Sequence, residues 1–199
     1  GNPLNEYNKE RPINMYRATY QLIANIKGWL PNEAKCLVWY GHGAADSTYI
    51  VPLWASMTRL PQIYQNGSRF GKFDRDSAWW VASYVQQTAT QNYDSAIEEI
   101  HAARDPRMDT QYVVAAQMQE AAAALIEAGK TDEAVELLTS YAYNNAQEWH
   151  DYWLEFGDEL YGTYMFNRVD MKQAPYPDWW KGILDNAPRN PGVTEEAAK

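Results

Sequence analysis

The sequence has one cysteine, Cys36, and no apolar run long enough to cross a membrane. A single cysteine excludes an internal disulfide and a cysteine-based zinc site, and it leaves the redox compartment open. There is no run of lysine and arginine, and the net charge of −9 argues against nucleic acid or an anionic membrane as partner. The three histidines are far apart, and none stands in an HExxH or HxH arrangement. We therefore expect no metal and no other cofactor.

Aromatic residues, by contrast, are abundant, with nine Trp and fifteen Tyr against four Phe. Trp and Tyr combine a large apolar body with a polar tip, which suits a binding cleft as well as a core with wet edges. The hydrophobic share of 46% and the charged share of 22% are typical of a globular protein. A chain of 199 residues is long enough for one or two domains.

The first 73 residues predict a mixed α/β segment. From Asn14, apolar positions recur at helical spacing, and Gly28 is expected to end that helix. Two apolar runs, 36–40 and 49–54, flank the turn-rich sequence GHGAADS and predict two strands joined by a long loop. Pro52 places the second strand at an edge of the sheet or at a bulge.

Residues 74–166 predict a helical region, and residues 167–199 an extended tail rich in Pro and Trp. Asp76 or Ser77 is expected to cap the first helix, Asp105-Pro106 to end the second and Gly129 to end the third. The expected helices run from about 77 to 93, from 97 to 105, from 110 to 128 and from 131 to 156. The sequence EAGKTDEAVELL indicates an ordinary helical hairpin, because no second copy follows at the period of a helical repeat.

No motif in the chain supplies an activated nucleophile. There is neither a GxSxG elbow nor a Gly-rich phosphate loop, and Cys36 lies inside an apolar run without an adjacent base. Glu148, Asp151 and Glu155 share one helix face beside two tryptophans, a pattern that fits a solvated face or an acid/base or sugar site. From these residues alone, the chain is an α+β protein of open function.

Three motifs in order resemble the bacterial dipeptidase A-type cysteine dipeptidases of the N-terminal-nucleophile (Ntn) hydrolase superfamily. The first is RPINMYRATYQLIANIKGWLP followed by CLVWYGHGAADSTYIVPLW. The second is FDRDSAWW at residues 73–80, and the third is APYPDWWKGIL near the end. Together they span residues 11–184.

The resemblance implies an Ntn-hydrolase αββα fold, of which this chain is a C-terminal fragment with strands near 34–55 and helices from 74 to 166. It implies hydrolysis of dipeptides by an N-terminal Cys that is absent from the chain, so we expect the chain alone to be inactive. Arg11 and Arg17 are the candidate active-site residues, because the superfamily places a late arginine in its site. The same resemblance leaves a structural ion pair open for either residue.

The implied partners are a small dipeptide substrate and the N-terminal half of the same protein, with a homo-oligomer left open. The compartment is the bacterial cytoplasm, or the periplasm or exterior if the full-length protein has a signal peptide. Two alternatives stay open: a Trp-rich module that binds peptide or carbohydrate without catalysis, and a structural helical domain.

Overall fold

The computed structural model of the chain describes residues 14, 18–166, 168–169, 172–173 and 175–186. The described part is mixed α/β and about 59% helical. Its elements in chain order are β1 Tyr20–Ile26, α1 Asn32–Lys35, β2 Cys36–His42, β3 Val51–Trp54, the 3-10 helix η2 Gln62–Tyr64, α2 Ala78–Ala89, α3 Tyr93–Glu127, α4 Thr131–Tyr164, β4 Arg168–Val169, β5 Lys172–Gln173 and α5 Asp178–Asn186.

The first three strands form an antiparallel sheet in the order β1-β2-β3. The β1–β2 register runs from Tyr20 opposite His42 to Ile26 opposite Cys36. In the second pair, Trp39 lies opposite Pro52. The two strands predicted around GHGAADS are therefore confirmed, and so is the edge position of Pro52, whose missing N–H excludes it from a central strand.

The helix expected from Asn14 is wrong, because residues 20–26 form β1. Leu22, Ile23 and Ile26 fit helical spacing, but they fit a strand with apolar residues on both faces equally well. The continuous pairing of β1 with β2 decides between the two patterns, and local spacing carries no information about that partner.

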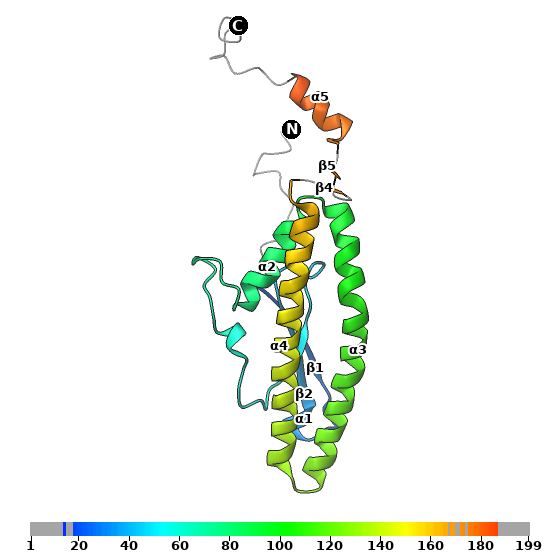
Figure 1. The fold of residues 1–199 in the computed structure, drawn as a ribbon. Coiled ribbons are helices and arrows are strands. Elements are labelled where there is room, and N and C mark those ends of the chain that lie inside the picture. Colours follow the sequence, from blue (N-terminus) through cyan, green and yellow to red (C-terminus); the bar gives the residue numbers. More distant parts are fainter. Residues whose placement is uncertain (1–13, 15–17, 167, 170–171, 174, 187–199) are drawn as a thin grey trace, which may run out of the picture.

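Helices α3 and α4 form a long antiparallel hairpin that covers one face of the sheet (Figure 1). Gly129 ends α3 with a φ of 76°, so the predicted stop and the predicted helical hairpin are both confirmed. Many of the buried positions of the two helices carry small side chains. The buried alanines of the hairpin include Ala115, Ala122, Ala123, Ala134, Ala142 and Ala146.

The helix break expected at Asp105-Pro106 is wrong, because α3 continues through Pro106. A proline inside a helix removes one backbone hydrogen bond and costs about 3 kcal/mol. Ile100 and Met108, one on each side of it, are both buried in the core. Packing on both flanks therefore holds the helix together across a residue that ends most helices.

The tryptophans of α4 lie in the core and its acidic residues face solvent. Trp149 and Trp153 are 3% and 0% exposed and pack with Tyr49, which lies just before β3. Glu148, Asp151 and Glu155 are exposed, as expected for the outer face of an amphipathic helix. Trp79 and Trp80 of α2 are half-buried, so they fill the core only in part.

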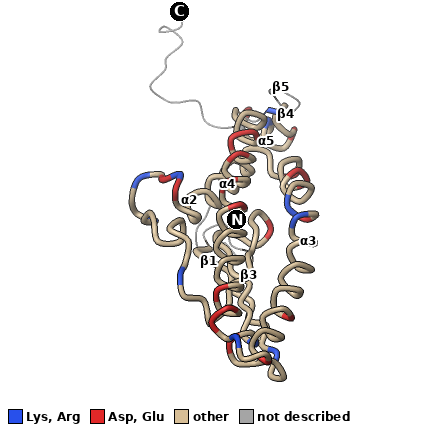
Figure 2. Tube along the Cα trace, turned by 60° about the horizontal axis from the view of Figure 1, so that its bottom comes forward, with Lys and Arg blue, Asp and Glu red and all other residues tan. Residues whose placement is uncertain are grey.

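The tail contains a helix where an extended run was expected, since α5 lies beyond the end of α4 (Figure 1). Asp178 lies in the first turn of α5, where its negative charge interacts favourably with the helix dipole. Trp179 is 67% exposed, so it does not pin the tail to the core. Acidic positions are spread along the helices (Figure 2). Within the described residues, no helix is both long and apolar enough to cross a membrane.

Candidate functional site

The loop that joins β2 to β3 gathers most of the polar interactions at that end of the sheet. It begins after His42, the last residue of β2. The backbone of Gly41 passes so close to Tyr49 that an added Cβ would meet the Tyr49 carbonyl oxygen at 2.3 Å. Only glycine fits there. The close crossing folds the loop back over the end of β2, and we call residues 42–48 the loop site.

Arg104 of α3 fastens the loop site to the helical layer. Its Nη1 donates to the Asp46 carbonyl oxygen at 2.6 Å and lies 3.4 Å from the carbonyl oxygens of Ala45 and Thr48. Its Nε donates to the Asp105 carboxylate at 2.7 Å. The guanidinium therefore binds several carbonyl oxygens of the loop and one carboxylate at once, which its fork of N–H donors allows.

The Asp46 side chain forms a second link to α3. Its carboxylate accepts a short hydrogen bond from the Tyr93 hydroxyl, and its backbone carbonyl interacts with His101 Nε2 at 3.1 Å. Partial burial acts to raise the pKa of Asp46, but the hydrogen bond from Tyr93 and others from Asn14 and Ser47 outweigh it and lower that pKa. The same bond, with partial burial, raises the pKa of Tyr93 to about 12. The pair is a charged acceptor with a neutral donor at neutral pH.

His42 presents the one imidazole at the end of β2. Its Nδ1 lies 3.2 Å from the Thr19 carbonyl oxygen, which makes Nδ1 the protonated nitrogen. Burial lowers the pKa of His42 despite that hydrogen bond, so the ring is neutral. Its Nε2 is buried and has no hydrogen-bond partner in the described part of the chain. Tyr40 and Tyr64 pack against the ring at centroid distances of 5.1 and 5.5 Å.

These groups do not assemble a nucleophile. Cys36 begins β2 and His42 ends it, so about 20 Å of strand separates the thiol from the imidazole. The Thr48 hydroxyl is buried without a hydrogen-bond partner in the described residues, so no base activates it. No group of His, Cys, Asp and Glu in the same part of the chain is arranged to hold a metal ion. Within the described residues, the loop site can accept and position hydrogen bonds, and it contains no activated nucleophile.

The predicted site residues Arg11 and Arg17 lie outside the described residues. The sequence analysis missed His42, Asp46 and Arg104. The available signal was the polar loop between two apolar runs, since buried polar loops need partners. Arg104 could not be found in this way, because it stands 58 residues from the carbonyl it binds.

The fold and the loop site define a class of protein: an α/β chain with an open three-stranded sheet, a helical layer on one face and no assembled nucleophile in its described residues. The model of Peptidase family C69 matches residues 2–105, just over half of the chain. The chain therefore belongs to Peptidase family C69, and the resemblance to dipeptidase A-type enzymes is confirmed at the level of the family. No curated protein matches the chain.

Proposed function

We propose that the chain is the C-terminal portion of a cysteine-type dipeptidase, whose nucleophile lies in sequence outside these 199 residues. The full-length protein that supplies the rest is called the parent below. The observation that carries the proposal is the match to Peptidase family C69 over residues 2–105. The ordered motifs at residues 11–54, 73–80 and 174–184 point to the same peptidases.

The exposed apolar side chains of β1 support the proposal that further parts of the parent cover the sheet. Tyr20, Leu22, Ile23 and Ile26 of β1 are 61%, 55%, 56% and 62% exposed, and their side chains alternate between the two faces of the sheet. The face of Tyr20, Leu22 and Ile26 is apolar, and Ile23 adds one exposed apolar side chain to the other face. An apolar strand face is typical of a covered sheet. We infer an Ntn-hydrolase αββα fold in the parent, in which α3 and α4 form one helical layer and a second sheet covers the face of Tyr20, Leu22 and Ile26.

The proposed reaction follows the chemistry of an N-terminal cysteine. The thiolate attacks the carbonyl carbon of the dipeptide, and the free α-amine of the same residue carries the proton. The C–N bond breaks as the leaving amine takes that proton, and water then hydrolyses the thioester to release the second amino acid. This chain supplies the scaffold: α3 and α4 support the sheet, and Arg104 holds the loop site in place.

Arg11 and Arg17 remain our candidates for the active-site arginine. A guanidinium binds a carboxylate bidentately or keeps the surroundings of a thiolate positive. If one of them contacts the substrate in the transition state, its replacement by Ala in the parent lowers kcat/KM by ~10²–10³. A surface ion pair would cost only ~0–1 kcal/mol of stability, so near-normal kinetics in both variants would remove the arginines from the site.

The alternative of a Trp-rich binding module has lost most of its support. Trp39, Trp54, Trp149 and Trp153 are 8% exposed or less. Buried indoles pack the core and present no surface to a ligand. These four of the nine tryptophans therefore belong to the interior, whereas Trp29 and Trp179 are 80% and 67% exposed.

The test is to assay the purified chain and the parent against a panel of dipeptides. We expect the parent to hydrolyse dipeptides and the chain alone to be inactive, because the described residues contain no activated nucleophile. The control is Cys36→Ala, which should change neither result. Turnover by the chain that disappears in Cys36→Ala would contradict the proposal, and so would an inactive parent with an intact N-terminal Cys.

A further inference from the structure

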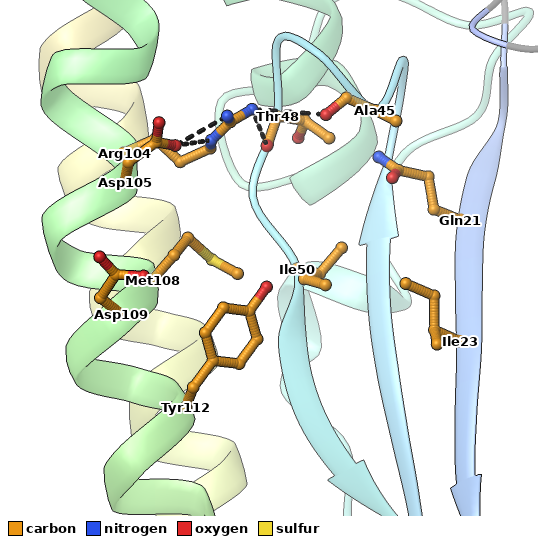
Figure 3. A pocket seen from close by; sticks show the side chains of 10 residues that line it. All are labelled: Gln21, Ile23, Ala45, Thr48, Ile50, Arg104, Asp105, Met108, Asp109 and Tyr112. Carbon is orange, nitrogen blue, oxygen red and sulfur yellow. Dashed lines mark hydrogen bonds and ion pairs between the residues drawn. The ribbon is translucent and has the colours of Figure 1, made fainter.

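A groove of about 450 Å³ lies between β1 and α3, on the face of the sheet that carries the helices. Gln21 and Ile23 of β1 lie on one side and Tyr112 of α3 on the other, with Ile50 between them (Figure 3). Ile50, Met108 and the exposed Ile23 give the groove an apolar floor. An apolar floor open to water is typical of a surface that another segment covers.

The rim of this groove carries an uncompensated negative charge. Asp105 is paired with Arg104 at 2.7 Å, so those two charges balance. Asp109 stands one turn further along α3, is exposed, and has no cationic partner among the described residues. Thr48 lines the same groove with a buried hydroxyl that lacks a hydrogen-bond partner there. The groove therefore combines apolar contact area with a site for one cation.

We propose that this groove receives a basic segment of the polypeptide that completes the sheet, with a lysine or arginine facing Asp109 and an apolar side chain on Ile23. The inference rests on the proposed function and adds the chemistry of the partner. A small amine in the groove would leave Leu22 and Ile26 exposed on the other face of β1, whereas a polypeptide that completes the sheet covers both faces. Charge complementarity selects a basic segment over an acidic one.

The experiment compares Asp109→Asn in the parent and in the chain alone by thermal unfolding. We expect the parent to lose roughly 2–4 °C, because the facing cation is left without its partner, and the chain alone to be unchanged. The loss should shrink in 1 M salt, which screens such pairs. The matched control is Glu120→Gln, an exposed acid on the same helix that does not line the groove, and it should change neither protein.

An unchanged midpoint of the parent would overturn the proposal. An equal loss in both proteins would also overturn it, because Asp109 would then act within this chain. If the chain alone forms a concentration-dependent dimer by sedimentation, and Asp109→Asn weakens that dimer, the occupant is a second copy and the proposal is wrong. A parent that hydrolyses dipeptides but tolerates Asp109→Asn would leave the proposed function standing and remove only the docking partner.

Discussion

Strand β1 and the hairpin of α3 and α4 differ in how far their apolar side chains are buried. The hairpin packs into a common core with the sheet, and Ala122, Ala142 and Trp153 are each 0% exposed. By contrast, Leu22 and Ile26 of β1 are more than half exposed. The hairpin is therefore well packed at these positions. Strand β1 is rich in apolar residues, as a buried strand is, but its side chains are exposed. The difference teaches that the described chain buries the apolar side chains of the hairpin and leaves those of β1 exposed to solvent.

The largest expected effect on stability concerns the buried core of the hairpin. Trp153→Ala should lower the free energy of unfolding of the chain by about 3–5 kcal/mol, because it leaves a cavity at a fully buried aromatic residue. Chemical denaturation measures the loss. Trp29→Ala is the matched control, since Trp29 is 80% exposed and its loss should stay within about 0.5 kcal/mol. Equal losses at the two positions would refute the packing described for α4.

A second prediction concerns the link between the hairpin and the sheet. Gln111 Nε2 donates to the Ile50 carbonyl oxygen at 2.8 Å, and its Oε1 accepts from Asn145 at 2.6 Å and Trp149 at 2.9 Å. Gln111→Leu should cost about 2–3 kcal/mol in the same assay, because three buried polar groups lose their partner. Gln117→Leu, at an exposed position of α3, is the control and should be nearly neutral.

A third prediction uses pH at the loop site. Tyr93→Phe should cost about 1 kcal/mol near neutral pH, because Asp46 loses a hydrogen bond. The pKa of Asp46 is lower in the folded protein than its ordinary value of 3.8. The contribution of Asp46 to folding stability is therefore present above pH 3.8 and is lost as the pH falls through the pKa of the folded state. The pKa of Tyr93 is raised to about 12, so its contribution is present below the ordinary value of 10.0 and is lost as the pH rises through about 12.

Thermal unfolding across pH checks this prediction. The stability difference between wild type and Tyr93→Phe should be largest between those two limits and should narrow at both ends. A difference that stays constant from acid to alkaline pH would show that the Asp46–Tyr93 bond contributes nothing to stability.

The smallest expected effect on the stability of the chain concerns the exposed strand β1. Leu22→Ala should change the stability of the chain by no more than about 0.5 kcal/mol, because Leu22 is 55% exposed. In the parent, where we propose that a second sheet covers it, the same change should cost about 2–5 kcal/mol. Denaturation of both proteins decides the matter, and a small effect in both would mean that this face stays open.

Prediction from the sequence succeeded where local chemistry decides. Gly129 ends α3 because the stop requires a positive φ, and Pro52 lies at an edge because it lacks an N–H. It failed at β1 and at Pro106, where a distant partner or packing on both flanks outweighs local preference. The loop site was missed for the same reason, since Asp46 meets Tyr93 and Arg104 only after the chain has folded.

The sequence by itself determined the family, through motifs of which the first two lie within the residues that the family model matches. It also determined the helical region, because apolar spacing and stop residues act over a few turns. Only the tertiary structure decided that residues 20–26 are a strand, that Arg104 holds the loop at 42–48, and that Asp109 lies beside an open groove without a cationic partner among the described residues. These features depend on contacts between residues tens of positions apart. Pairing and packing across that distance leave no periodic signal in a single sequence.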